Sequence, residues 1–287
     1  MEEHMRIGIG SRDYYSVYDY EEGFKKIKSH GYDCVDYGDI SNIDSDLYNL
    51  AGEEYCAFFK KVRESAEKSG IEIWQMHSVW PTVNFDKTEA DRQKTTEYFI
   101  RQIEAAHYLD CGYFVLHPFM PFGYDVEGDY SFTFDANVDL LQKLIPYAEK
   151  WNVTLCVENL PFPNNPVSKV SEVKRLVHTV NHPRVKVCLD TGHANIFSSD
   201  IAADVRLLGD DLAALHVHDN SGWCDAHKIP YSGTIKWDEF LTALGEIGFN
   251  GCLNLESSIP IKMPEPYREE MRLSLAKLTR EMVNKIK

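Results

Sequence analysis

The sequence predicts an α/β protein with a single domain, a (β/α)8 (TIM) barrel that spans residues 1–287. Eight strand-like apolar runs alternate with eight helix-like segments, which is typical of parallel strands joined by right-handed helical crossovers. The length of 287 residues accommodates one such barrel, of about 250 residues, together with its loops. Six of the runs end on a histidine or an acid, as expected where barrel strands open onto a shared site.

Each predicted strand is a short run rich in aliphatic residues, and each predicted helix is a longer stretch that follows such a run. In chain order, the strand and helix pairs are residues 6–11 and 20–30, 34–38 and 51–69, 71–78 and 88–109, 113–118 and 135–151, 154–159 and 171–180, 185–192 and 200–209, 212–220 and 237–247, and 251–257 and 266–286. Gly31 and Gly70 stand where two helices should end, because glycine readily adopts the left-handed conformation of a helix C-cap. Gly248 stands just before the last strand.

A doubly wound open sheet is the rival architecture for this alternation. Such a sheet normally carries a glycine-rich phosphate loop after its first strand, and GIGSRDYY lacks the G-x-G-x-x-G pattern. The barrel is therefore the predicted architecture.

The strands divide into two faces, since residues two apart on a strand point the same way. Cys156 and Glu158 share one face of their strand, and Leu155 and Val157 share the other. The aliphatic face suits contact with surrounding helices, whereas the small or polar face suits the barrel interior. The same division places three further residues on the polar face, namely Asp190, His216 and Glu256.

Composition excludes some classes of protein and disfavours others. The formal net charge of −15 repels polyanions at long range, so nucleic acid is a disfavoured partner. The seven cysteines include no C-x-x-C pair and are scattered as small apolar residues, which fits a reducing cytoplasm. No signal peptide and no run of about 18 apolar residues is found, so we expect a cytoplasmic protein without a membrane partner. A homo-oligomer is compatible with all of this.

Four of the strand-end residues form the predicted metal site: Glu158, Asp190, His216 and Glu256. They would project from the fifth to the eighth strand, which are neighbours around a barrel. Three carboxylates and one imidazole suit a divalent ion such as Mn²⁺, Co²⁺, Mg²⁺, Fe²⁺ or Zn²⁺. A structural network of buried polar groups is the alternative. His218 shares a face with His216 and would replace it as a ligand if the strand register differed.

A second set of residues has two open interpretations. These residues could bind further metal ions, or they could orient the substrate and the ligands of the first ion. Asp-Thr-Gly-His places one of them three residues after Asp190, and two others lie in a loop. The set consists of His77, His117, His193, Asp225 and His227.

The ordered segments HPFMP, VENLP, CLDTGHANI, HVHDN, DAH, PYSGTIKW and LNLES resemble the xylose isomerase-like TIM-barrel superfamily. That superfamily joins sugar phosphate isomerases and epimerases with the endonuclease IV-type AP endonucleases. In the epimerase branch, the resemblance implies that Glu158, Asp190, His216 and Glu256 hold one divalent ion, with Glu158 and Glu256 also acting as the acid/base pair. In the endonuclease branch, it implies a trinuclear zinc site on these four residues together with His77, His117, His193, Asp225 and His227.

Loop charges favour the sugar branch. An endonuclease must grip phosphates with basic side chains or backbone donors around its site. Residues 117–135 contain no Lys or Arg, and residues 37–46 are similarly acidic without a basic residue. The first of these loops carries Asp125, Glu127, Asp129 and Asp135.

The expected function is therefore that of a metal-dependent isomerase or epimerase of a small sugar or sugar phosphate. It would act by proton transfer next to a carbonyl, with the ion stabilising the enediolate and Glu158 and Glu256 exchanging protons with the substrate. Two alternatives remain: a zinc-dependent phosphodiesterase that acts on abasic DNA, and a non-catalytic sugar-binding barrel.

Overall fold

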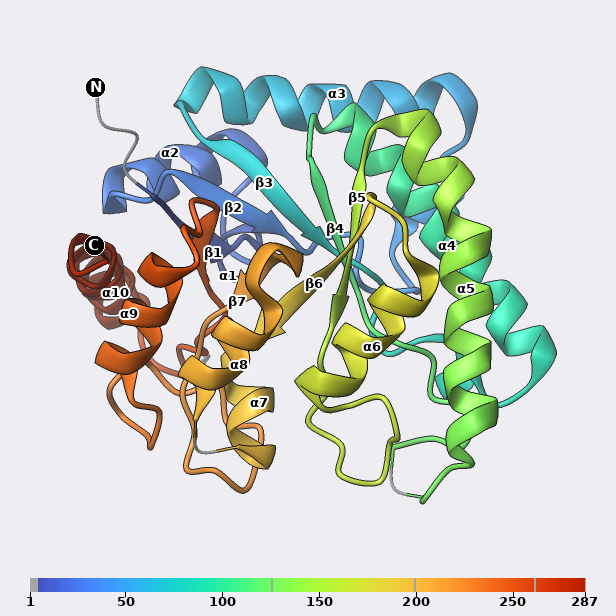
Figure 1. Cartoon of the computed structure of the whole chain (residues 1–287). Coiled ribbons are helices and arrows are strands. Elements are labelled where there is room, and N and C mark those ends of the chain that lie inside the picture. Colours follow the sequence, from blue (N-terminus) through green and yellow to red (C-terminus); the bar gives the residue numbers. More distant parts are fainter. Residues whose placement is uncertain (1–4, 125, 199, 261, 287) are drawn as a thin grey trace.

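Eight parallel strands form the centre of the molecule in the order β7-β6-β5-β4-β3-β2-β1-β8, and helices surround them (Figure 1). The computed structural model describes residues 5–124, 126–198, 200–260 and 262–286. Parallel pairing of Val217 with Leu255, beyond the end of β7, joins the two outer strands and closes the barrel. The strands are β1 (Arg6–Gly10), β2 (Cys34–Tyr37), β3 (Glu72–His77), β4 (Tyr113–Leu116), β5 (Thr154–Glu158), β6 (Val185–Asp190), β7 (Leu212–His216) and β8 (Cys252–Leu255).

The helices follow the strands in the expected alternation, which confirms the (β/α)8 fold. Gly31, Gly70 and Gly248 all adopt the left-handed conformation, with φ of 101°, 69° and 67°. The longer helices are α2 (Tyr20–His30), α3 (Gly52–Ser69), α4 (Glu89–Tyr108), α5 (Tyr130–Trp151), α6 (Val170–Val180), α8 (Ile201–Leu208), α9 (Trp237–Glu246) and α10 (Glu265–Asn284). The short ones are α1 (Arg12–Tyr15), α7 (Thr191–Phe197), η1 (Asp46–Asn49), η2 (Val83–Asp86) and η3 (Gly209–Asp211).

Several boundaries differ from the predicted ones, and among them β7 ends at His216 rather than at residue 220. A side-chain cap explains two of the differences. Helix α5 begins at Tyr130 rather than near residue 135, because the Asp129 carboxylate accepts a hydrogen bond of 2.7 Å from the Phe132 amide. Strand β6 ends at Asp190 rather than at residue 192, because this carboxylate accepts a hydrogen bond of 2.6 Å from the His193 amide and starts α7. Asp125 lies outside the described residues.

The two faces of the strands are buried in different surroundings, as predicted. Val115, Cys156, Cys188 and Ala214 form a small apolar cluster of their own within the barrel. The aliphatic faces belong to the large core between the sheet and the helices, which includes Leu155, Val157, Val187 and Leu215. All seven cysteines are free. Within the described residues, no helix is long and apolar enough to cross a membrane.

Candidate metal centre and acid/base pair

The four predicted metal-site residues lie at adjacent strand ends. Glu158, Asp190 and His216 are the last residues of β5, β6 and β7, and Glu256 directly follows β8. One ligand atom from each residue lies within 4.8 Å of the ligand atoms of the other three. The alternating strand faces therefore deliver all four side chains to one point, as the sequence predicted.

Glu158 and His216 are in contact in the buried part of this group. The Nδ1 atom of His216 lies 2.9 Å from Oε1 of Glu158 and 3.5 Å from Oε2 of Glu256. Asp190 and His216 are fully buried, whereas the side chain of Glu256 is 32% exposed. Glu256 is thus the member of the group that a substrate entering from solvent meets first.

A carboxylate outside the predicted set contacts the other nitrogen of His216. Asp36 on β2 lies with its Oδ2 atom 2.8 Å from Nε2 of His216, and the Gln75 side-chain amide donates a hydrogen bond of 2.9 Å to the same oxygen. Carboxylates in this position orient a metal-binding imidazole and make it more basic. The sequence analysis misses Asp36, whose only signal in the sequence is an acid inside the apolar run CVDYG.

Burial and neighbouring charges together shift the pKa values of the two glutamates in opposite directions. Burial raises the pKa of Glu158, but His216 and His117 lower it more, and the net pKa lies well below the usual value of a glutamate. Burial raises the pKa of Glu256 above its usual value despite His216 and His227. Environments that separate two carboxyl groups in this way suit one group to accept a proton and the other to donate one.

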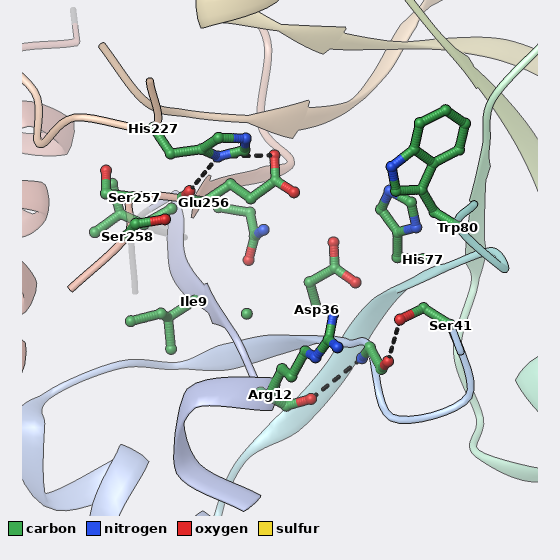
Figure 2. Close-up of a pocket in the computed structure, with 15 residues that line it drawn as sticks. Ile9, Arg12, Asp36, Ser41, His77, Trp80, His227, Glu256, Ser257 and Ser258 are labelled. Atoms are coloured by element: carbon green, nitrogen blue, oxygen red, sulfur yellow. Dashed lines mark hydrogen bonds and ion pairs between the residues drawn. The ribbon is translucent and has the colours of Figure 1, made fainter. Parts of the chain in front are cut away.

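A cavity of about 300 Å³ opens beside Glu256. The Asp36 carboxylate points into it between Glu256 and His77 (Figure 2). Residues from the ends of β1, β2, β3 and β8 line the cavity, so it reaches the candidate metal centre from solvent. A volume of this size is at the lower end for small-molecule sites, which suits a small substrate.

Two histidines of the second set contact Glu158. Nε2 of His117 lies 3.0 Å from Oε2 of Glu158, and Nε2 of His77 lies 3.5 Å from the same oxygen. The ring of His77 also stacks on that of His216, with 5.4 Å between the ring centroids. Both predicted residues therefore lie beside the first group.

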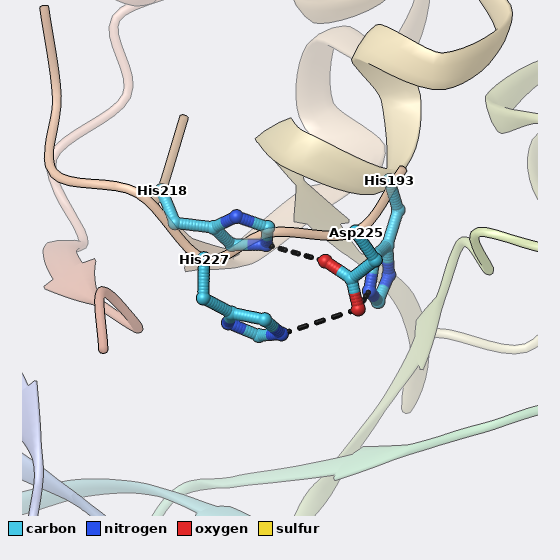
Figure 3. A group of neighbouring side chains, drawn as sticks. All are labelled: His193, His218, Asp225 and His227. Atoms are coloured by element: carbon cyan, nitrogen blue, oxygen red, sulfur yellow. Dashed lines mark hydrogen bonds and ion pairs between the residues drawn. The ribbon is translucent and has the colours of Figure 1, made fainter. Parts of the chain in front are cut away.

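The other three residues of the second set form a separate group with His218 (Figure 3). Asp225 lies between three imidazoles, with contacts of 3.4 Å to His193, 3.7 Å to His218 and 3.2 Å to His227. His218 also lies 3.0 Å from Oδ2 of Asp190, so the two groups adjoin. His216 therefore belongs to the first group and His218 to the second.

The donor set of the first group fits a divalent ion. Three carboxylates and an imidazole offer oxygen and nitrogen ligands without a thiolate, which suits a catalytic rather than a structural ion. Oε2 of Glu256 is buried and has no hydrogen-bond partner among the described residues. An oxygen in this state is free to coordinate a cation.

Sequence comparisons relate the chain to sugar epimerases and isomerases. Residues 24–278 match the family described as xylose isomerase-like TIM barrel. The D-psicose 3-epimerase of Ruminiclostridium cellulolyticum is 29% identical over 200 residues, which cover 68% of this chain and 67% of that protein. The inosose isomerase of Bacillus subtilis is 28% identical over 159 residues, which cover 52% of this chain and 56% of that protein.

Solved structures share the fold over almost the whole chain. A D-psicose 3-epimerase from Clostridium cellulolyticum with D-tagatose superimposes with a TM-score of 0.80 at 21% identity, covering 97% of this chain and 99% of that one. The IOLI protein with a zinc atom superimposes with a TM-score of 0.78 at 21% identity, covering 99% of both chains.

Proposed function

The chain belongs to the xylose isomerase-like TIM barrel family, and from this premise we propose that it is a divalent-metal-dependent sugar isomerase or epimerase. The observation that carries the proposal is the convergence of Glu158, Asp190, His216 and Glu256 at four adjacent strand ends, beside a cavity large enough for a small ligand. The two relatives named above, a D-psicose 3-epimerase and an inosose isomerase, support a small keto-sugar as the class of substrate.

The four converging residues would hold one ion. His216 presents Nδ1 to the group because Asp36 occupies its Nε2 side, and Glu158, Asp190 and Glu256 contribute carboxylate oxygens. A divalent ion bound there would supply electrostatic stabilisation of the negative charge that develops on substrate oxygens. Mn²⁺, Co²⁺, Mg²⁺, Fe²⁺ and Zn²⁺ all suit this donor set, and the zinc atom of the IOLI structure supports a divalent ion.

The two glutamates, Glu158 and Glu256, would transfer the protons. One carboxylate removes the proton from the carbon next to the substrate carbonyl, and the other returns a proton. Return to the opposite face of the same carbon gives the epimer, and return to the neighbouring carbon gives the isomer. Glu256 borders the cavity after β8, and Glu158 ends β5, so the two carboxylates would approach a bound substrate from different strands.

We assign the second set to two supporting roles. His77 and His117 contact Glu158 and would orient its carboxylate. The group formed by His193, Asp225, His227 and the additional His218 has its own donor set and would suit a second divalent ion next to Asp190. Elemental analysis of the wild type and of Asp225→Ala tests this assignment, since loss of one ion per chain in the variant is expected. An unchanged metal content would contradict it.

The function is tested by assaying purified, metal-loaded protein on a panel of ketoses and on an abasic oligonucleotide. Turnover of a ketose without cleavage of the oligonucleotide is expected. Cleavage beside the abasic position would instead support a zinc-dependent phosphodiesterase. Tightly bound metal without turnover of either substrate would support a sugar-binding barrel.

A further inference from the structure

One wall of the cavity beside Glu256 is polar, and it contains none of the four residues of the candidate metal centre. This wall comes from the ends of β1, β2 and β8 and from the residues that follow β1 and β8. Its members include Gly10, Arg12, Asp36, Asn254, Ser257 and Ser258.

Asp36 contributes a hydrogen-bond acceptor that nothing in the protein satisfies. Its Oδ2 atom is engaged by His216 and Gln75, but its Oδ1 atom is buried without a hydrogen-bond partner among the described residues. The residue is only 5% exposed. A buried carboxylate oxygen left without a donor is costly, so a ligand hydroxyl that donates to it binds favourably.

Asn254 contributes both a donor and an acceptor. It lies two residues before Glu256 and is 1% exposed, and neither Nδ2 nor Oδ1 has a hydrogen-bond partner within the described part of the chain. Gly8 faces it from β1, where a Cβ atom would lie 2.7 Å from Oδ1 of Asn254. The Asn254 amide is therefore closely packed against Gly8, while its N–H donor and its oxygen acceptor remain available to a ligand.

Gly10 keeps the cavity open next to these groups. A Cβ atom at this position would meet no heavy atom within 4 Å, so the space beyond it is free. Its φ lies outside the left-handed range, and thus the backbone does not require glycine here. Glycine at position 10 therefore leaves space for a ligand, and no turn of the backbone requires it.

We propose that this wall is a hydroxyl-binding subsite, in which Asp36 and Asn254 hold the part of the substrate remote from the reacting carbons. The matching ligand is an uncharged, polyhydroxylated ketone without a phosphate group. Oδ1 of Asp36 needs a donor, whereas a phosphate at neutral pH offers mainly acceptors and negative charge. Arg12 is the one Lys or Arg in the described lining, and its side chain is exposed to solvent. The proposal rests on the proposed function for the identity of the reacting group.

Equilibrium binding of sorbitol, a polyol that carries no carbonyl, tests the subsite without turnover. Calorimetry on the metal-loaded protein should show binding that Asn254→Leu weakens about five- to thirtyfold, since one or two hydrogen bonds are lost. Gly10→Ala should weaken binding by filling the cavity, and it serves as the probe if Asn254→Leu does not fold. Gly112→Ala is the matched control, because a Cβ atom there also meets nothing within 4 Å and Gly112 does not line the cavity.

Absence of sorbitol binding to the wild type, or equal binding by wild type, Asn254→Leu and Gly10→Ala, would overturn the subsite. Tighter binding of D-fructose 6-phosphate than of D-fructose would overturn the choice of an uncharged ligand. Failure of every ketose to turn over, with sorbitol binding sensitive to both substitutions, would refute the proposed function and leave the subsite standing. With turnover, Asn254→Leu should raise KM for the best ketohexose but not for the four-carbon L-erythrulose, which lacks the remote hydroxyls.

Discussion

His216 is held from both sides, and this determines which of its nitrogens faces the candidate metal centre. Asp36 lies 2.8 Å from Nε2, and Glu158 lies 2.9 Å from Nδ1. An imidazole fixed in this way loses little freedom when it binds an ion. The Asp36 contact should therefore strengthen metal binding although Asp36 is not itself in the group of four.

Asp36→Ala should weaken metal binding about 10- to 100-fold, the usual cost of removing a carboxylate behind a metal-binding histidine. Asp36→Asn should recover most of the affinity, because its amide oxygen can still accept a hydrogen bond from Nε2 of His216. Titration of metal-free protein with Zn²⁺ against a competing chelator measures both variants. Equal affinity of wild type and Asp36→Ala would contradict the positioning role.

At the residue scale, the sequence predicted the members of the first group but missed Asp36. Glu158, Asp190, His216 and Glu256 were identifiable because each one ends an apolar run. Asp36 lies within its run, and the pairing of β2 with β3 shifts register between Val35 and Asp36. Such an irregularity redirects a side chain, and the spacing of residues along a strand does not reveal it.

The β7–α9 loop, which carries Asp225 and His227, is organised by a buried aspartate. Asp219 accepts hydrogen bonds from the backbone amides of Asn220, Gly233 and Ile235 and from the indole of Trp237, at 2.9, 2.9, 3.3 and 2.9 Å. Because both ends of the loop bond to one carboxylate, the loop is closed into a fixed shape.

Asp219→Ala should lower the free energy of unfolding by about 3 kcal/mol or more, since it leaves several buried donors without an acceptor. Urea unfolding measures this loss, and limited proteolysis should show new cleavage between residues 220 and 236. The exposed Asp210 provides a control, because Asp210→Ala should change stability by less than about 0.5 kcal/mol. Similar stability of the two variants would show that the loop does not depend on Asp219.

The turn before α4 contains a carboxyl group that should make stability depend on pH. Asp86 is fully buried and accepts hydrogen bonds of 2.7 Å from the hydroxyls of Thr82 and Thr95. Burial raises its pKa from 3.8 to about 6. The folded protein thus retains a proton that the unfolded chain has already released, and the associated stability is lost as the pH rises from about 4 to about 6.

Asp86→Asn should therefore become more stable relative to the wild type by about 3 kcal/mol between pH 4 and pH 7, which corresponds to about two pKa units. Urea unfolding of both proteins at the two pH values measures the difference in their free energies of unfolding. The titration of other groups contributes equally to both proteins and drops out of this difference. A difference that does not change with pH would mean that Asp86 titrates normally.

At the scale of elements, alternation and glycine caps predicted the order of strands and longer helices, but side-chain capping set several boundaries. Asp129 starts α5 earlier than the apolar pattern indicated, and Asp190 ends β6 and starts α7 at the same point. Asp190 shows why the pattern was insufficient: one carboxylate caps a helix and also lies in the candidate metal centre. The periodicity of apolar residues indicates which positions are buried, but it does not reveal local hydrogen bonds of this kind.

The charge of the whole molecule argues against a nucleic-acid substrate. The net charge is −15, and the acidic loops at residues 37–46 and 117–135 contain no Lys or Arg. Anisotropy measurements with a labelled abasic duplex should show only weak binding even at about 50 mM salt, where phosphate contacts are strong. Nanomolar binding with cleavage beside the abasic position would contradict the sugar-directed function.

The central claim is that Glu158 and Glu256 exchange protons with a carbon atom of the substrate. Their replacement by glutamine removes a proton acceptor with little change in volume, and metal content must be checked in parallel because both residues lie in the candidate metal centre. The most direct test is the incorporation of solvent deuterium into the substrate carbon by the wild type, Glu158→Gln and Glu256→Gln. We predict deuterium in the wild-type product, and we predict that one glutamine variant, with its metal retained, exchanges the proton of one epimer without forming the other. Wild-type turnover without solvent deuterium in the product would contradict the two-carboxylate mechanism.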